Sequence, residues 1–391
     1  MNRYLPTLIA TVLLAVSTAG YAIDKDIEPK IPPGYVPEEA QDEAGIWMEM
    51  WEIETKLRQS PMLVKDAEFN AYVQSVVCEV AGAYCRDFRV YLIRNPGFNA
   101  SMTATGMMQI WTGLLTRVTT TDELAAVIGH EIAHYTGLHT LEQWRGLKSG
   151  LAVGSFFDLA LLAATGVGVP LGQATAMLNA LAFSREQEQE ADILGAQMLA
   201  EAGLDPHAAY RVWNMIVDEE ESAAVKRRKP GIFSKTHPDA KKRAGKLEDW
   251  VTERFGPVSE GPPDQGRHVA LLNKHYLFLM EDQLDTNRFG RTKEMLERHE
   301  RAGVERGLVE YFRGEMLRQR GGDGDEEGAM EAYQRSIDGG LAPPEAFKNL
   351  GYLCLKAGDK VLAMENFRMY LEAKPDASDR AMIEFYLEET T

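Results

Sequence analysis

The sequence predicts an α+β fold: a mostly α-helical domain with a small sheet, followed by an all-α domain of tetratricopeptide-like helical repeats. Apolar residues at helical spacing dominate the chain, and only two short segments before position 112 have a strand-like pattern. A stretch rich in Pro and Gly then divides the chain, and small and aromatic residues recur beyond it at the offsets of a helical repeat. The length of 391 residues is sufficient for two folded domains.

The composition excludes several classes of protein. With 45% hydrophobic and 26% charged residues, the chain is neither wholly disordered nor a polytopic membrane protein. The formal net charge of −17 at pH 7 would repel a phosphate backbone. Nucleic acid is therefore not an expected partner.

Residues 1–22 have the pattern of an export signal. Arg3 precedes an apolar run at residues 8–16, and small residues at 20–22 predict cleavage before Ile23. The alternative is an uncleaved membrane anchor, but the apolar run is shorter than the roughly 20 residues that span a bilayer. Cleavage would remove one positive charge, that of Arg3, and so change the formal charge from −17 to −18.

Export affects how the three cysteines are interpreted, because thiols can pair in an oxidising compartment. Cys78 and Cys85 lie at the end of a helical pattern over residues 67–81, which we expect Gly82 to end. A local disulfide between them is sterically feasible, although the spacing alone does not establish it. Cys354 lies in an apolar helical pattern and is expected to be a small buried side chain.

The elements that precede the most informative helix are two helices and two strands. Apolar residues at helical spacing predict one helix over residues 37–58 and a second that runs up to Cys85. The alternating segment 88–94 and the glycine-bounded segment 106–111 predict two short strands. A small sheet should therefore precede the main helix.

The main helix carries the residues with chemical significance. Thr120 and Glu123 have the spacing of a capping box, with Thr120 as N-cap. His130, Glu131 and His134 then form the HExxH pattern, which places two imidazoles one turn apart on one face. A chance match is expected at most about 0.02 times in a chain of this composition. We therefore predict one Zn²⁺ per chain, with His130 and His134 as two of its ligands.

A catalytic zinc ion takes three protein ligands, so one more is needed. A third histidine after a helix break would have to stand at position 140, but that residue is Thr140 and His139 is one position early. The other source is a glutamate from a later helix, and the segment 184–192 (SREQEQEAD) places Glu188 and Asp192 four residues apart on one face. Glu188 is then the predicted ligand, and Asp192 accepts a hydrogen bond from a ligating imidazole.

Three polar residues near this set are not expected to be ligands. Glu186 and Glu190 lie on other faces of the predicted helix and should point to solvent. His139 should be either a polar surface residue or a residue that supports one of the ligands.

HEIAH together with SREQEQEAD resembles the gluzincin metallopeptidases, a family that includes the CAAX prenyl endopeptidases and the HtpX-type heat-shock proteases. The resemblance covers about residues 40–255 and implies a zincin-type metallopeptidase domain with Glu188 as third zinc ligand. Asn99-Ala100 resembles the edge strand that binds substrate in this family. Thr236-His237-Pro238, with Arg243, resembles its late histidine loop.

The chemistry of such a site assigns roles to these residues. Glu131 is the predicted general base, which takes a proton from zinc-activated water and can pass it to the leaving amine. His237 is a donor to the oxyanion, a fourth ligand that holds the site closed, as the resemblance implies, or a loop histidine with no part in the chemistry. Arg243 is a weaker donor or a structural partner of the loop. Substrate should bind as an extended strand along the edge at Asn99 and Ala100.

Within the family, an exported chain with helical repeats resembles the BepA-like periplasmic proteases, which act in outer-membrane protein assembly. We predict the metallopeptidase domain over residues 36–255, a linker (GPVSEGPPDQG) over 256–266 and the repeat domain over 267–391. The apolar stretch at 150–168 predicts a buried helical hairpin, with a peripheral membrane contact as the alternative.

The predicted repeats rest on the spacing of small and aromatic residues. Gly351, Ala363, Phe367 and Pro375 have the offsets of a tetratricopeptide repeat, and a similar set begins at Gly314. The small residues let two helices approach while the aromatic fills the space between them. An ordinary helical bundle is the alternative.

Together these features predict a zinc metalloendopeptidase of the periplasm. Its substrates would be unfolded or misassembled envelope proteins, and its repeat domain would contact the outer-membrane assembly machinery. The alternative is a repeat-based periplasmic chaperone or adaptor whose metal site is latent or self-inhibited by His237.

Overall fold

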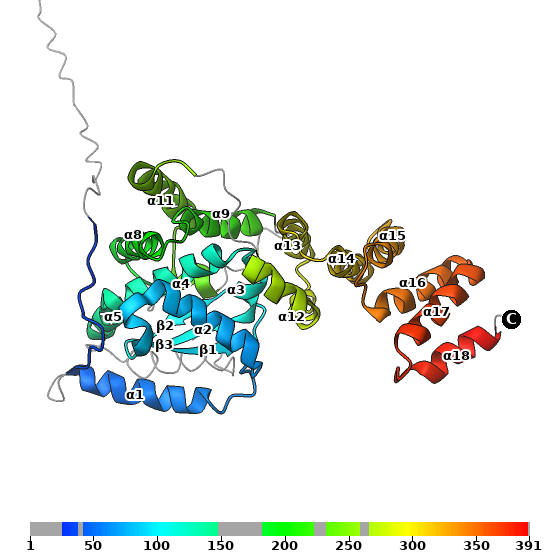
Figure 1. The fold of residues 1–391 in the computed structure, drawn as a ribbon, viewed down its shortest axis with the longest axis horizontal. Helices are drawn as coiled ribbons and strands as arrows, with labels where there is room; N and C mark the ends of the chain where they lie inside the picture. Colours follow the sequence, from blue (N-terminus) through cyan, green and yellow to red (C-terminus); the bar gives the residue numbers. More distant parts are fainter. Residues whose placement is uncertain (1–25, 38–41, 148–181, 223–231, 259–265, 390–391) are drawn as a thin grey trace, which may run out of the picture.

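The computed structural model of the chain describes residues 26–37, 42–147, 182–222, 232–258 and 266–389. The predicted export signal and the apolar stretch at 150–168 lie outside these residues. Within them the fold is mostly helical with one three-stranded sheet, which confirms the predicted α+β class (Figure 1). No helix in the described ranges is long and apolar enough to cross a membrane.

The first two helices are α1 (Asp42–Leu57) and α2 (Ala67–Ala81). Helix α2 begins after Asp66, whose carboxylate accepts a hydrogen bond from the Phe69 amide at 2.8 Å. It ends at Gly82, which adopts φ +52°, a value that glycine reaches without steric cost. A disulfide joins Cys78 in the last turn of α2 to Cys85 in the 3₁₀ turn η1 (Gly82–Asp87), with their Cα atoms 4.6 Å apart.

The sheet contains strands β1 (Arg89–Ile93), β2 (Ala100–Met102) and β3 (Met107–Trp111) in the order β1-β3-β2. Strand β3 is central and fully buried, parallel to β1 and antiparallel to β2. The two strands expected from alternation correspond to β1 and β3. Strand β2 forms one edge of the sheet and is only three residues long, too short for a periodic pattern.

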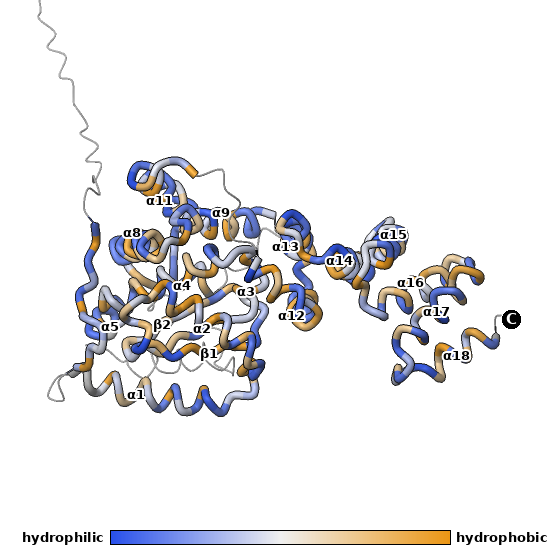
Figure 2. Tube along the Cα trace, viewed as in Figure 1, coloured by the Kyte–Doolittle hydropathy of each residue, from blue (hydrophilic) through white to orange (hydrophobic). Residues whose placement is uncertain are grey.

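Helix α4 (Thr121–Thr136) lies at the centre of the apolar interior, and all of its residues except Glu123 are buried (Figure 2). The Thr120 hydroxyl accepts a hydrogen bond from the Glu123 amide at 3.1 Å, as the capping-box spacing predicts. The Glu123 carboxylate, however, accepts from the amide of Thr119 at 2.7 Å instead of that of Thr120. The second hydrogen bond of the capping box is therefore made to the amide of residue 119 instead of that of the N-cap residue.

Helix α8 (Arg185–Glu201) crosses α4 at two glycines. A Cβ atom on Gly195 would lie 2.9 Å from the His130 backbone nitrogen, and one on Gly129 would lie 3.1 Å from the Gly195 carbonyl oxygen. Any larger residue at position 195 would push the two helices apart. The glycines thus set the distance between α4 and α8 at the position of His130. Helices α3 (Thr112–Arg117), α5 (His139–Leu147), α9 (Ala208–Glu221), α10 (Ile232–Thr236) and α11 (Ala240–Phe255) complete this body.

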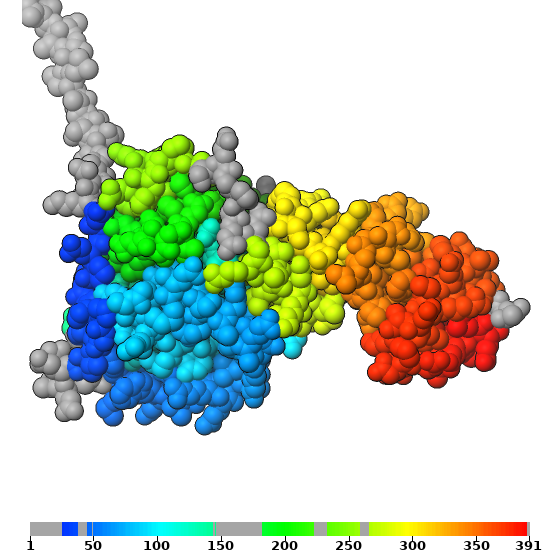
Figure 3. All heavy atoms as spheres, viewed as in Figure 1, coloured from blue at the N-terminus to red at the C-terminus, as the bar shows by residue number. Residues whose placement is uncertain are grey.

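Seven helices follow the predicted linker, and they extend from the body as an arm (Figures 1 and 3). They are α12 (Gly266–Leu284), α13 (Phe289–Ala302), α14 (Arg306–Arg320), α15 (Asp325–Asp338), α16 (Pro344–Ala357), α17 (Lys360–Ala373) and α18 (Arg380–Glu389). The first two pack against the body: His268 donates to the carbonyl of Leu115 at 2.9 Å, and His299 donates to that of Thr116 at 2.7 Å. The division into two domains at the linker therefore stays a prediction.

A buried charge cluster also connects α12 and α13 to the body. Arg117 of α3 is 2% exposed and donates to Glu219 of α9 at 2.9 Å and to Gln283 of α12 at 3.1 Å. Arg298 of α13 donates to the other oxygen of Glu219 at 2.7 Å. Because the cluster is shielded from water, removing one partner would leave an uncompensated buried charge.

In the arm, consecutive helices pack as pairs, α14 with α15 and α16 with α17. A Cβ atom on Gly314 would lie 2.6 Å from the ring of Tyr333, and one on Gly351 would lie 2.7 Å from the ring of Phe367. Each aromatic ring therefore fills the space that a glycine leaves, which is the packing that the sequence spacing predicts. Cys354 is buried and carries a free thiol, as expected.

Candidate metal centre

Helix α4 supplies the first two residues of the site. His130 and His134 are one turn apart, and their Nε2 atoms lie 3.1 Å from each other. Both side chains are buried, and burial lowers the pKa of each imidazole below its ordinary value. Neutral imidazoles have a free lone pair, the form in which histidine binds a metal.

Glu188, on the first turns of α8, supplies a carboxylate to the same point. Helix α8 starts with a capping box in which Ser184 and Gln187 bond each other's main chain, and this fixes the turn that carries Glu188. The Glu188 oxygens lie 3.6 Å from His134 Nε2 and 3.7 Å from His130 Nε2. Burial opposes ionisation of Glu188, but the neighbouring His237 and Arg243 outweigh it and lower its pKa.

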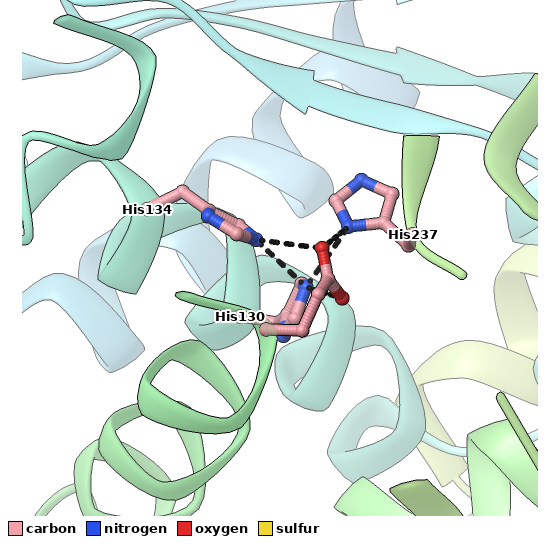
Figure 4. A group of neighbouring side chains, drawn as sticks. His130, His134 and His237 are labelled. Atoms are coloured by element: carbon pink, nitrogen blue, oxygen red, sulfur yellow. Dashed lines mark hydrogen bonds and ion pairs between the residues drawn. The ribbon is translucent and has the colours of Figure 1, made fainter. Parts of the chain in front are cut away.

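His237 is the fourth member of this group. It follows α10, and its Nδ1 atom lies 3.0 Å from Glu188 Oε1 and 3.2 Å from His130 Nε2. Figure 4 shows the three imidazoles directed at a common point, with the carboxylate between them. The loop histidine expected from the sequence therefore reaches the ligand cluster itself.

The geometry of the four groups fits a tetrahedral metal ion. Ligand atoms about 2.0–2.1 Å from a tetrahedral zinc ion are about 3.3–3.4 Å from each other. The five distances given above, from 3.0 to 3.7 Å, bracket this value, and the ligand atoms of all four groups lie within 4.8 Å of one another. Three imidazole nitrogens and one carboxylate oxygen form a donor set that zinc commonly takes, and other divalent transition metals accept the same ligands.

The charge of the site also fits a divalent cation. Glu131, Glu188 and Asp192 are buried carboxylates, and Arg243 is the buried cation that contacts two of them. When all three carboxylates are ionised, the formal sum is −3 + 1 = −2, which a buried site does not tolerate. A divalent cation would neutralise this charge.

Asp192 positions His130 from behind. Its Oδ1 atom lies 3.1 Å from His130 Nδ1 and accepts a hydrogen bond from Trp213 Nε1 at 3.1 Å. Arg243 donates to both carboxylate oxygens, at 2.8 and 2.5 Å, and also contacts Glu188. The Arg243 guanidinium lies over the Trp213 ring, 4.5 Å from its centroid. Asp192 is therefore held ionised, with its pKa well below the usual range despite burial.

Glu131 faces the site from the residue next to His130. It is 2% exposed, and burial raises its pKa to about 7. His237 Nε2 lies 3.5 Å from its Oε1 atom, and His237 and the main-chain amide of Met102 both favour the ionised carboxylate and so oppose this rise in its pKa. A carboxyl with this pKa can accept and return a proton near neutral pH.

Burial also opposes the protonation of His237, but the carboxylates of Glu188 and Glu131 outweigh it and raise the pKa of His237. In the metal-free protein the pKa values of Glu131 and His237 are thus both raised, and a proton bound to either group reduces the net negative charge of the site. This agrees with the excess negative charge of the site.

The structure brings together His130, His134, Glu188, Asp192, Arg243, Glu131 and His237, and it places His139, Glu190 and Phe183 next to them. His139 is fully buried against His134, and Glu190 is half-buried with its carboxylate 3.4 Å from His139, so Glu190 does not simply face solvent as expected. Phe183 stacks on the His134 ring at 3.8 Å. The only sequence signal for His139 is its spacing of five residues after His134; nothing in the sequence indicates Phe183.

Strand β2, which forms an edge of the sheet, lies beside α4 and begins at Ala100, one residue after Asn99. The Asn99 carbonyl accepts a hydrogen bond from the Trp111 amide at 3.0 Å, and the Thr103 amide donates to Met107 at 3.0 Å. Main-chain groups alternate in direction along an antiparallel strand, so those of Ala100 face the outer edge of the sheet. Of the two predicted substrate-binding residues, Ala100 therefore has the outward main chain.

An HExxH helix that meets a glutamate from a second helix, with an aspartate four residues later behind a ligating histidine, defines a gluzincin-type metallopeptidase. Comparison with known families agrees with the geometry. Residues 64–251 match the model of Peptidase family M48, so this part of the chain is a domain of that family.

Relatives with described names support the same class. The chain is 30% identical over 180 residues to "Mitochondrial metalloendopeptidase OMA1" of Schizosaccharomyces pombe, covering 45% of this chain and 50% of the relative. It is 28% identical over 217 residues to "Putative beta-barrel assembly-enhancing protease" of Vibrio cholerae (53% and 43%), and 27% identical over 219 residues to "Beta-barrel assembly-enhancing protease" of Escherichia coli (51% and 43%). The matches span half or less of the length of these relatives.

Proposed function

We propose that this chain is a zinc-dependent metalloendopeptidase of the periplasm, which cleaves misfolded or misassembled envelope and outer-membrane proteins. The observation that carries the proposal is the convergence of His130, His134 and Glu188 on one point with Glu131 beside them. A binding protein would have no use for a buried carboxyl of neutral pKa next to three metal ligands.

Each residue of the site has a separate role in the proposed reaction. Zinc held by His130, His134 and Glu188 would supply a Lewis acid that polarises a peptide carbonyl and lowers the pKa of water. Glu131, in its ionised form, accepts the proton from the attacking water and returns it to the leaving amine. Asp192 keeps the His130 ring oriented for coordination.

Substrate would bind in an extended conformation along β2. The outward main chain of Ala100 can pair with an added strand, and this mode of binding accepts many sequences. The main-chain amide of Met102, two residues later, is near enough to Glu131 to favour its ionised form. The edge strand therefore places a bound peptide next to the general base, and it favours unfolded segments over folded proteins.

The periplasmic assignment rests on two supports. Residues 1–22 have the pattern of an export signal, and the Cys78–Cys85 disulfide is typical of an oxidising compartment. The helical arm would bind the outer-membrane assembly machinery or the substrates, because stacked helix pairs form extended binding surfaces. The relatives named beta-barrel assembly-enhancing protease support the same role.

A second candidate function is that of a chaperone or adaptor with a self-inhibited site. The position of His237 favours it, since Nδ1 of this residue occupies the fourth corner of the ligand group, where water would otherwise bind. We infer that His237 acts as a closing ligand at rest. In that case the parent protein cleaves substrate only in the fraction of molecules whose His237 loop has moved away from the ligand group.

The test is the cleavage of casein together with zinc content, for the chain that begins at Ile23. Parent protein, Glu131→Gln and His237→Ala are compared, with Glu186→Gln as a control, because Glu186 is exposed on the same helix as Glu188. We expect one zinc per chain in all four, loss of cleavage only in Glu131→Gln, and faster cleavage in His237→Ala. Unchanged cleavage in Glu131→Gln would refute the peptidase mechanism.

A further inference from the structure

His139 lies fully buried beside the metal ligand His134, although it is not part of the ligand group. The Nδ1 atoms of the two rings are 2.9 Å apart, and the rings meet at 75°. The chain reverses between α4 and α5 at Leu138, which has φ +57°. Gly137 leaves the necessary room, because a Cβ atom there would lie 2.7 Å from His139 Nε2. The local backbone is thus arranged to bring His139 back onto His134.

The positions of the two imidazoles determine where their protons must lie. His134 Nε2 faces His130 Nε2 and Glu188, so this nitrogen needs a free lone pair to bind a metal. A neutral His134 therefore carries its proton on Nδ1 and donates it to His139 Nδ1. His139 then carries its own proton on Nε2, which lies 3.4 Å from the Glu190 carboxylate.

We propose that His139 is a positioning residue for His134, and that Glu190, His139 and His134 form a carboxylate–imidazole–imidazole relay that fixes the metal-binding tautomer. The proposal rests on the metal site of the proposed function but does not require proteolysis. It assigns a role to a buried histidine that neither binds the metal nor reaches substrate.

The other ligand on α4 is supported by the same chemistry at shorter range. His130 Nδ1 lies 3.1 Å from a carboxylate oxygen of Asp192, with no residue between them. Helix α8 provides both carboxylates, since Asp192 and Glu190 are two residues apart on it. One helix thus orients both imidazoles of the HExxH pattern, directly in one case and through His139 in the other.

The outer end of the relay is held by the segment 26–37. Lys30 donates its main-chain amide to the carbonyl of Thr136, at the end of α4, at 2.9 Å. Its ammonium group lies 3.6 Å from Glu190 and 3.4 Å from Glu142. The Lys30 side chain is 40% exposed, so this ion pair contributes little by itself. We therefore expect effects that decrease from His139 through Glu190 to Lys30.

The test measures the zinc dissociation constant by chelator competition, in chains that also carry Glu131→Gln so that no cleavage occurs. His139→Phe fills the site but removes the acceptor for His134, and His139→Asn keeps an acceptor oxygen near the position of Nδ1. We expect the dissociation constant to rise about 10–100-fold in His139→Phe, and His139→Asn to recover most of the affinity. Glu190→Gln should have a smaller effect, and Lys30→Met the smallest.

A role limited to packing predicts the opposite order, because Phe fills the space better than Asn. Melting temperatures of the metal-free variants measure that contribution separately. Parent-like zinc affinity in His139→Phe, or weaker affinity in His139→Asn than in His139→Phe, would overturn the relay while leaving the proposed peptidase in place.

A second measurement does not depend on the metal. In metal-free protein with ¹⁵N-labelled histidine, the His134 signal, assigned by its loss in His134→Gln, should show the proton on Nδ1. A proton on Nε2 would overturn the relay. Absence of zinc binding in the parent protein would instead refute the proposed function, and the tautomer of His134 would still decide the relay.

Discussion

The raised pKa of Glu131 leads to a prediction about stability as well as activity. The ordinary pKa of a glutamate is 4.5, and burial raises that of Glu131 to about 7 in the folded, metal-free protein. Between these values the folded state binds more protons than the unfolded state, so this group makes the protein less stable as pH rises from 4.5 to 7. Glu131→Gln mimics the protonated form and removes this loss.

The magnitude follows from the size of the shift. A difference of about 2.5 pKa units at about 1.4 kcal/mol per unit corresponds to about 3 kcal/mol. We therefore expect Glu131→Gln to raise the free energy of unfolding by about 3 kcal/mol at pH 8, and by less than about 1 kcal/mol at pH 5. With zinc bound the difference should shrink, because the cation stabilises the ionised carboxylate of the parent protein.

The assay is urea-induced unfolding of metal-free protein between pH 5 and pH 8. Glu186→Gln provides the matched control, since it makes the same substitution at an exposed position of α8. A stabilisation by Glu131→Gln that is equal at both pH values, or no stabilisation at pH 8, would show that burial does not raise the pKa of Glu131.

Three further predictions concern the metal site and its support. Glu188→Gln should reduce zinc from one per chain to near zero by atomic absorption; full occupancy would place the third ligand elsewhere. Gly195→Ala should destabilise the protein by about 1–3 kcal/mol and weaken zinc binding, because the added methyl would meet the His130 backbone; parent-like unfolding and affinity would contradict the close crossing. Replacing Cys78 and Cys85 by Ser should cost about 2–3 kcal/mol in urea unfolding, as expected for a loop of this length, and no change would mean that the disulfide does not constrain the unfolded chain.

The parts of the fold that the sequence predicted best are those set by nearby residues. Helix α2 spans residues 67–81 as its pattern indicates, because Asp66 and Gly82 act within one turn of its ends. Thr120 starts α4 for the same reason. Strand β2 was expected only from the family resemblance, since three residues carry no periodicity of their own.

The parts that the sequence did not predict depend on contacts between distant segments. The helical pattern alone predicts that Glu190 points to solvent, but the chain reversal at Leu138 places His139 next to it. The crossing at Gly129 and Gly195 sets the distance between α8 and α4, and so the distance of the α8 carboxylates from the α4 histidines. The helical pattern of the sequence does not predict this distance. The candidate ligand group and the position of Asp192 behind it could be predicted from short motifs, whereas the contact between His139 and Glu190 depends on the tertiary structure.

The attachment of α12 and α13 has a consequence for how the molecule is assembled. Helix α3 ends just before the HExxH helix, and its last carbonyls and Arg117 find partners on segments 153 to 183 residues later in the sequence. A fragment cut at residue 258 would keep every proposed metal ligand but would leave α3 exposed, with Gln283 and Arg298 missing from the charge cluster. We expect the metallopeptidase body to reach its final stability only when α12 and α13 have packed against it. The first two helices of the arm therefore belong to the folding unit of the enzyme.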